Sequence, residues 1–320
     1  MNQVREKADA AVREASKIII GKEEQIGLIL AAVFSGGHIL LDDLPGAGKT
    51  TLVKVLSKIL GCTFSRVQFT PDLLPSDITG LSVFDQRTGD FRVMDGPIMT
   101  NLFLADEINR AIPRTQSALL EAMEELQVTI EGAARALPRP FLVMATQNPV
   151  ESESTFRLPA AQMDRFFMRL SLGYPTRDQE TLMLKTIGDE IPFDSLTPVL
   201  DAEEIRAIQK EISGIRIDDR VTDYIVQIVE ATRGGKLLTL PAGPRGSRSL
   251  YRGGKALAAI RGRDFVTPGD IKTLAPYVLT HRIVPSGEAR LMNKTAASII
   301  EDILNTVPVP GGDEEMIGAK

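Results

Sequence analysis

The chain has 320 residues, a length typical of about two domains. Its 43% hydrophobic and 25% charged residues are ordinary for a globular protein and exclude a wholly disordered chain. The single cysteine, Cys62, cannot form a disulfide within the chain, so we expect a reducing compartment. The net charge of -5 comes from 42 acidic and 37 basic residues without a long run of one sign, and it gives no reason to expect nucleic acid as a partner.

The chain shows no pattern typical of export or of membrane insertion. Residues 1–17 mix basic and acidic side chains, whereas a signal peptide needs a cationic start and an unbroken apolar core. The longest apolar stretch, residues 26–34, is about half of the length that spans a bilayer. We therefore expect no membrane span and a cytoplasmic location.

Strands and helices alternate in the first part of the chain. Apolar periodicity predicts helices within residues 4–15, 26–33 and 49–60. Short apolar runs predict five strands, at residues 38–42, 66–69, 102–105, 141–145 and 167–172. Because their apolar character is continuous, we expect strands that are buried on both faces, and therefore a parallel sheet with helices on each side.

Two insertions and a change of pattern complete the predicted organisation. The insertions, residues 81–94 and 126–137, are predicted β-hairpins. Beyond about residue 197 the strand pattern ends, and helices are predicted at residues 202–212, 221–232, 249–260, 268–279 and 294–304. We thus predict an α/β fold with a five-stranded parallel sheet core at residues 1–195, an all-helical lid at 196–306 and a disordered tail at 307–320.

The first candidate site lies between the first predicted strand and the helix that follows it. Its sequence is Asp43-Leu44-Pro45-Gly46-Ala47-Gly48-Lys49-Thr50-Thr51. A glycine-rich loop at a helix N-terminus can wrap phosphates with its backbone N–H groups, as in a P-loop. Here Lys49 would neutralise phosphate oxygens and Thr50 would offer its hydroxyl to Mg²⁺. The P-loop pattern begins with glycine where this chain has Asp43, and a tight turn with an exposed lysine is the alternative.

Acidic residues end another predicted strand. Asp106 and Glu107 follow the apolar run at residues 102–105, and the loop end of a neighbouring parallel strand is where a metal-bound nucleotide would lie. Asp106 would hold Mg²⁺, commonly through water, and Glu107 would orient the water that attacks the phosphate. The alternative is that the pair caps a helix.

A third strand leads to Thr146-Gln147-Asn148-Pro149. The amide of Asn148 could bind a γ-phosphate or the attacking water, and the alternative is an Asx-turn before Pro149. We favour Asn148 as the phosphate sensor, with Thr146 as the weaker candidate.

Several segments together resemble the MoxR family of AAA+ ATPases. They are residues 68–80, 96–98, 106–111, 116–123 and 145–149. The similarity extends over residues 18–283. It implies an ATPase core with a helical lid, ATP and Mg²⁺ as cofactors, and a homo-oligomeric ring that is often a hexamer. It also implies a chaperone-like role on proteins with von Willebrand factor type A domains or on metal-cofactor enzymes.

The resemblance also implies roles for two arginines. Arg165, in the segment of residues 158–166, resembles an arginine finger, which projects across a subunit interface to the neighbour's γ-phosphate. A structural ion pair is the alternative. Gly243-Pro244-Arg245 resembles the sensor-2 segment, which places Arg245 on the phosphates of its own subunit. Arg248 stands where the family usually has an apolar residue.

Ile19, Ile20 and Gly21 match the segment that lies against adenine in this family, with core packing as the alternative. Residues 154–160 depart from the family's usual run, which leaves the geometry that leads to Arg165 open. The resulting candidates for nucleotide binding are Ile20, Gly21, Pro45, Gly46, Ala47, Gly48, Lys49, Thr50 and Thr51; for Mg²⁺, Thr50 and Asp106; and for catalysis, Glu107, Asn148, Arg165 and Arg245.

Three classes of function follow from these candidates: an ATP-driven remodelling chaperone, a nucleic-acid motor and a nucleotide-binding scaffold without hydrolysis. The scaffold is disfavoured because every candidate catalytic residue is present. A DNA translocase should carry basic residues at its hairpin tips, whereas residues 85–90 are charge-balanced. We therefore predict ATP hydrolysis that drives remodelling of protein partners, and a magnesium-chelatase-like motor subunit stays open as an alternative.

Overall fold

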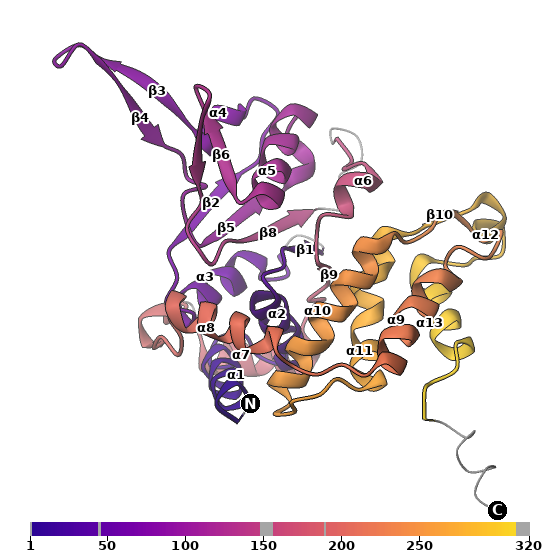
Figure 1. The fold of residues 1–320 in the computed structure, drawn as a ribbon. Coiled ribbons are helices and arrows are strands. Elements are labelled where there is room, and N and C mark those ends of the chain that lie inside the picture. Colours follow the sequence, from indigo (N-terminus) through magenta and orange to yellow (C-terminus); the bar gives the residue numbers. More distant parts are fainter. Residues whose placement is uncertain (1, 44–45, 148–155, 189, 312–320) are drawn as a thin grey trace, which may run out of the picture.

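The computed structural model describes residues 2–43, 46–147, 156–188 and 190–311. A five-stranded sheet lies at its centre, in the order β2-β5-β8-β1-β9 (Figure 1). All neighbouring strands in it are parallel, which confirms the predicted sheet. Its strands are β1 (Ile39–Asp42), β2 (Phe64–Gln68), β5 (Leu102–Asp106), β8 (Leu142–Gln147) and β9 (Met168–Leu170).

Helices cover the sheet and connect its strands. In the first 195 residues they are α1 (Asn2–Ala15), α2 (Glu23–Ser35), α3 (Lys49–Ile59), α4 (Pro75–Thr79), α5 (Pro113–Glu125), α6 (Ala160–Met163) and α7 (Arg177–Thr186). Alternate residues of the central strands enter two hydrophobic clusters, so that Leu41 and Leu104 pack on one face while Leu40 and Phe103 pack on the other. This two-sided burial explains the uninterrupted apolar runs of the sequence. The edge strand β2 is only partly buried.

Because the strands are parallel, all of them begin along one side of the sheet, the amino edge, and all of them end along the opposite side, the carboxyl edge. Both sides matter for the site. At the carboxyl edge, where the strands end, β5 terminates in Asp106. At the amino edge, where they begin, the N–H of Phe167 donates a hydrogen bond to the carbonyl of His38 (2.8 Å). Helix α5 begins shortly after Asp106 and ends at the amino edge, where Nε2 of His38 lies 3.0 Å from the carbonyl of Met123. At about 1.5 Å per residue, the 13 residues of α5 separate the two edges by about 20 Å.

Both predicted hairpins are present. Strands β3 (Gly80–Asp85) and β4 (Asp90–Asp95) form one, which projects from the body of the molecule (Figure 1). Strands β6 (Gln127–Ile130) and β7 (Ala133–Ala136) form the other. An ion pair between Arg135 and Asp95 (2.5 Å) joins the two hairpins.

The remainder of the described chain is mainly helical, as predicted. Its helices are α8 (Ala202–Ser213), α9 (Asp219–Ala231), α10 (Pro244–Ile260), α11 (Pro268–Leu279), α12 (Gly287–Leu291) and α13 (Ala296–Thr306). A small antiparallel sheet of β10 (Leu238–Leu240) and β11 (Val284–Pro285), which the sequence pattern did not predict, joins them. Helix α10 begins five residues earlier than predicted, and its Gly253 is needed for close packing because a Cβ there would lie 2.9 Å from the ring of Phe167.

The predicted core and lid share one interior. A single hydrophobic cluster contains residues of α1, α2 and α3 together with residues of α8, α9, α10, α11 and α13. Helix α10 packs against α2 and α11 (Figure 1). Within the described ranges, no helix is both long enough and apolar enough to span a bilayer.

Candidate active site

The glycine-rich loop has a backbone that suits phosphate binding. It connects β1 to α3, and Gly46 (φ 82°) and Gly48 (φ 78°) adopt the left-handed conformation. A Cβ at either position would meet nothing within 4 Å, so the backbone conformation and not a lack of space favours glycine there. Gly48 precedes the first residue of α3 and offers no side-chain cap. The first-turn N–H groups of α3 therefore keep their capacity to bind an anion.

Lys49 lies at the carboxyl edge of the sheet. Its Nζ donates hydrogen bonds to the carbonyl oxygens of Asp43 (2.6 Å) and Gln147 (3.4 Å), at the ends of the adjacent strands β1 and β8. The ammonium group is thus positioned between the glycine-rich loop and the end of β8. This position suits a cation that neutralises phosphate oxygens.

The structure explains the departure at Asp43. Its buried carboxylate accepts hydrogen bonds from Oγ of Ser171 (2.5 Å) and from the N–H groups of Leu172 (2.7 Å) and Gly173 (3.0 Å). Asp43 therefore ties the start of the loop to the segment that follows β9. Sequence reasoning noted this residue only as a mismatch and missed its role.

Asp106 is held by groups from both neighbouring strands. Its Oδ1 accepts a hydrogen bond from the hydroxyl of Thr146 on β8 (2.6 Å), and its Oδ2 accepts from Nε (3.0 Å) and Nη2 (2.7 Å) of Arg66 on β2. The same Thr146 hydroxyl accepts a hydrogen bond from the backbone N–H of Glu107 (2.8 Å). Thr146 thus fixes both acidic residues relative to β8.

Glu107 adopts a left-handed conformation (φ 56°, ψ 50°), which is uncommon for a residue other than glycine and is found at functional sites. Its Oε2 accepts hydrogen bonds from Nε2 of Gln68 (2.6 Å) and from Nη1 of Arg110 (2.9 Å). Gln68 pairs in register with Asp106 across β2 and β5. Glu107 therefore lies at the same edge as Lys49, with its carboxylate directed by two donors.

The donor set fits Mg²⁺. The Asp106 carboxylate and the Thr50 hydroxyl are hard oxygen ligands of the kind that Mg²⁺ takes together with substrate phosphates. Asp106 also forms an ion pair with Arg66 (2.7 Å), which holds its carboxylate in place. Within the described residues, there is no group of three or more His, Cys, Asp or Glu side chains that could hold a metal ion by itself.

The other predicted nucleotide contacts have mixed outcomes. Thr51 follows Thr50 in the first turn of α3. Gly21 lies next to α7, because Nε2 of Gln179 donates to its carbonyl (3.4 Å) and a Cβ on Gly21 would overlap that side chain. The contact of Ile20 and Gly21 with adenine stays a prediction. Pro45 and Asn148 are outside the described residues.

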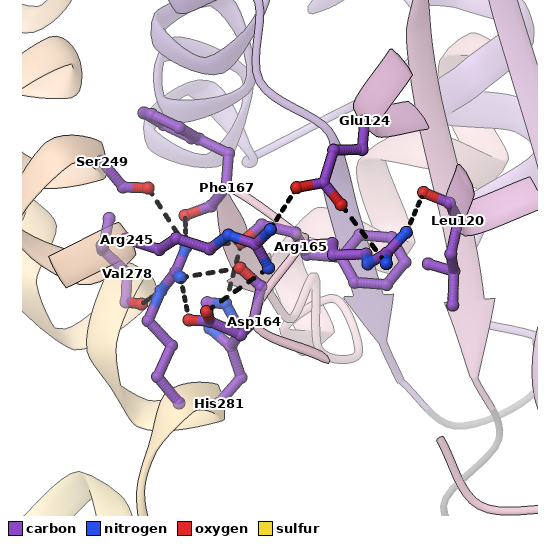
Figure 2. A network of polar contacts seen from close by, with 11 residues as sticks. Leu120, Glu124, Asp164, Arg165, Phe167, Arg245, Ser249, Val278 and His281 are labelled. Carbon is purple, nitrogen blue, oxygen red and sulfur yellow. Dashed lines mark hydrogen bonds and ion pairs between the residues drawn. The ribbon is translucent and has the colours of Figure 1, made fainter. Parts of the chain in front are cut away.

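Arg165 and Arg245 lie together at the amino edge (Figure 2). Nη1 of Arg165 donates to the carbonyl of Leu120 (2.6 Å), and its Nη2 lies 3.3 Å from Glu124. Arg245 pairs with the other oxygen of Glu124, and its Nη1 lies 3.7 Å from Asp164. These residues border a cavity of about 370 Å³ that also contacts Gly37 and His38 at the start of β1.

In this structure Arg245 lies away from the glycine-rich loop, so its predicted contact with the phosphates of its own subunit stays a prediction. Lys49 is at the carboxyl edge, and Arg245 is at the amino edge, so the length of the sheet separates them. The reason is that the start of α10 packs beside the C-terminal end of α5, where Glu124 holds it. Arg165 forms a structural ion pair with Glu124, which is the alternative to its role as an arginine finger.

Sequence reasoning missed Gln68, Arg66 and Glu124 and underrated Thr146. Arg66 and Gln68 are two residues apart on β2, so their side chains lie on the same face of the sheet. This spacing, on the strand next to Asp106, is the sequence signal that could have identified them. The role of Glu124 gave no signal, because it depends on where α10 packs.

The fold and this edge of the sheet define a P-loop ATPase core with a helical lid. Residues 38–168 match the ATPase family associated with various cellular activities (AAA), and residues 230–303 match the AAA lid domain. Chaperone MoxR1 of Mycobacterium tuberculosis is 37% identical over a 311-residue alignment that covers 94% of this chain and 82% of that protein. The chain belongs to the MoxR family of AAA+ ATPases.

Two further relatives extend over nearly all of the chain. Uncharacterized protein YeaC of Bacillus subtilis is 46% identical over 300 residues, which are 94% of each chain. The crystal structure of a candidate ATPase from Cytophaga hutchinsonii superposes with a TM-score of 0.89 at 38% identity and covers 96% of both chains.

Proposed function

We propose that the protein hydrolyses ATP in a head-to-tail ring of its own subunits and uses the energy to remodel partner proteins in the cytoplasm. The observation that carries this proposal is the separation of two half-sites. Lys49 and Glu107 lie at the carboxyl edge of the sheet, while Arg165 and Arg245 lie at the amino edge, about 20 Å away along α5. Contact between the edges of adjacent subunits would complete one site, and repetition of this heterologous contact closes a ring.

The chemistry assigned to each residue follows from its position. Lys49 and the first-turn N–H groups of α3 bind the phosphates. Glu107, directed by Gln68 and Arg110, orients the attacking water and accepts its proton. Asp106 and Thr50 would hold Mg²⁺, which would supply charge neutralisation at the phosphates. The neighbour's Arg165, together with its Arg245, compensates the charge that develops in the transition state. Asn148 stays assigned to phosphate sensing.

The projecting hairpin favours a protein partner. Phe84 and Phe91 form an edge-on pair with ring centroids 5.4 Å apart, and they are 49% and 74% exposed. Exposed apolar side chains of this kind are typical of surfaces that bind proteins. The hairpin carries three aspartates and two arginines, whereas a surface for nucleic acid needs a basic excess. The name of chaperone MoxR1 agrees with remodelling. Proteins with von Willebrand factor type A domains and metal-cofactor enzymes are the proposed partners.

Mixing of two inactive variants tests the proposal. Arg165→Ala should bind ATP and turn it over at least about 10³-fold more slowly, and Lys49→Ala should lose nucleotide binding. When both are mixed, an Arg165→Ala site can use the intact finger of a Lys49→Ala neighbour. In a random equal mixture, about a quarter of the interfaces would be complete. Activity should therefore return.

Subunit exchange is confirmed by capture of an untagged variant with a tagged one. Lys54→Ala, on the exposed face of the same helix, is the matched control for Lys49→Ala and should keep nucleotide affinity. If confirmed mixed rings stay as inactive as the parent variants, Arg165 does not act on a neighbour and the ring mechanism is wrong. Partners can be captured with Glu107→Gln, and Phe84→Ser should reduce that capture.

A further inference from the structure

We propose that Arg282, in the lid, is a positioning residue that sets the backbone from which Arg165 projects. This inference rests on the proposed catalytic role of Arg165. Arg282 belongs to the short 3-10 helix η3 (Thr280–Arg282), which follows α11. It is 118 residues from Asp164 in sequence and lies on the opposite side of the predicted core–lid boundary.

The guanidinium of Arg282 binds the chain on both sides of Arg165. Its Nη1 donates to the carbonyl of Asp164 (2.8 Å) and pairs with the Asp164 carboxylate. Its Nη2 donates to the carbonyl of Phe166 (2.6 Å). The residues immediately before and after Arg165 are thus held by one side chain.

The same guanidinium is itself fixed within the lid. Its Nε donates to the carbonyl of Val278 (2.7 Å), and its Nη2 also donates to Oγ of Ser249 on α10 (3.1 Å) (Figure 2). Only 1% of the Arg282 side chain is exposed. A planar guanidinium with several fixed donors can hold these acceptors together, whereas the single ammonium group of lysine cannot reproduce the pattern.

The neighbouring residue supports the same segment. Nε2 of His281 lies 3.1 Å from the carbonyl of Phe166, and burial lowers the pKa of His281 to about 3. The ring is therefore neutral at physiological pH, and its Nε2–H donates to that carbonyl. Two consecutive lid residues, His281 and Arg282, thus donate hydrogen bonds to the carbonyl of Phe166, the residue after Arg165.

These contacts between the lid and the backbone around Arg165 have a consequence for catalysis. An arginine finger must place its charge accurately, because a displacement of about 1 Å can reduce turnover about 100-fold. The side chain of Arg165 is held by Leu120 and Glu124 of α5, but its backbone is held by the lid. The position of the lid therefore determines the point from which the finger reaches the neighbouring site.

A double-mutant cycle on turnover tests the proposal. Arg282→Met removes the donors while it keeps the bulk, and we expect kcat to fall roughly 10- to 100-fold with little change in the KM for ATP. In the Arg165→Ala background, Arg282→Met should cause no further loss, because its effect passes through Arg165. Arg290→Met, at an exposed position of α12, is the matched control and should leave turnover unchanged.

Folding and assembly are checked by thermal unfolding and by size-exclusion chromatography with light scattering. If Arg282→Met does not fold, Arg282→Lys enters the same cycle, since it keeps the charge that faces Asp164 but loses the simultaneous bonds to both carbonyls. It should assemble and still turn over slowly.

The outcomes separate this inference from the proposed function. Wild-type turnover in a folded Arg282 variant, or a loss that multiplies with that of Arg165→Ala, would show that Arg282 does not act through Arg165, while the finger itself would stand. Wild-type turnover in Arg165→Ala would instead remove the finger from the mechanism and this inference with it.

Discussion

The carboxylate of Asp43 accepts a hydrogen bond from the backbone N–H of Leu172 at 2.7 Å, which joins the start of the glycine-rich loop to the end of strand β9. In Asp43→Asn, the new amide can accept at one atom only, so either Leu172 or both Ser171 and Gly173 lose their acceptor. We expect the free energy of unfolding to fall by about 1–3 kcal/mol, with weaker ATP binding. Urea denaturation and a fluorescent ATP analogue measure the two effects. Asp90→Asn, at the exposed hairpin turn, should change neither, and equal losses in both variants would contradict the role of Asp43.

Glu107→Gln should separate binding from hydrolysis. The amide keeps the shape of the side chain but cannot accept a proton from water, so we expect normal ATP affinity and a turnover lower by about 100-fold or more. Phosphate release measured at saturating ATP is the test. Glu121→Gln, at an exposed position of α5, is the control. Turnover like that of the wild type would reduce Glu107 to a structural residue.

Thr146→Val removes one hydroxyl and keeps the shape of a buried side chain. The link between Asp106 and the N–H of Glu107 is lost with it, so we expect kcat to fall roughly tenfold or more while ATP still binds. Thr146→Ser keeps the hydroxyl and should recover most of the activity. If valine and serine behave alike in steady-state assays, the hydroxyl does not position the acidic pair.

Glu124→Gln should raise turnover. Glu124 pairs with both Arg165 and Arg245, and in the proposed ring these half-exposed pairs must break before the arginines reach a neighbour's phosphates. Loss of the charge removes up to about 1 kcal/mol of competition, so we expect a two- to fivefold gain in kcat. Glu125→Gln should have no effect. Reduced turnover would show that Glu124 orients the arginines instead of competing for them.

His38 should make stability depend on pH. Its Nε2–H donates to the carbonyl of Met123, its Nδ1 accepts from the N–H of Val143, and burial lowers its pKa to about 4. The unfolded chain, with a histidine pKa near 6.5, binds more protons below that pH. The stabilisation from neutral His38 is therefore complete above about pH 6.5 and is lost as the pH falls toward 4, by about 2 kcal/mol at pH 5.

Urea denaturation at pH 7 and pH 5 measures this loss. His38→Asn should have a smaller difference between the two pH values than the wild type, and His281 should account for much of what remains, since its pKa is lowered in the same direction. An unchanged difference in His38→Asn would contradict the assignment.

The sequence predicted those parts of the fold that depend on local pattern. The central strands were found because β1, β5 and β8 are buried on both faces, and the hairpins because Gly89 and Gly132 mark their turns. Helix α7 has no buried residue, so no apolar periodicity revealed it. Strands β10 and β11 are too short to give a pattern.

The candidate site likewise has parts that the sequence could predict and parts that it could not. The glycine-rich loop and the Asp106–Glu107 pair could be predicted, because their residue types are adjacent in the chain. The contacts that direct them could not, because Gln68, Thr146 and Arg282 reach their partners only through strand register or helix packing. The position of Arg245 could not be predicted for the same reason, since sequence order does not show on which edge α10 begins.

The shared hydrophobic interior has a mechanical consequence. Because the helices of the lid and those beside the sheet bury their side chains in one cluster, a swing of the lid would expose apolar surface and is opposed by the hydrophobic effect. In the proposed ring, each subunit should therefore move as a rigid body, so that the work done on a partner comes from rotation of whole subunits against each other. The chain should also melt in one calorimetric transition, and a cut between residues 195 and 196 should yield no independently stable half.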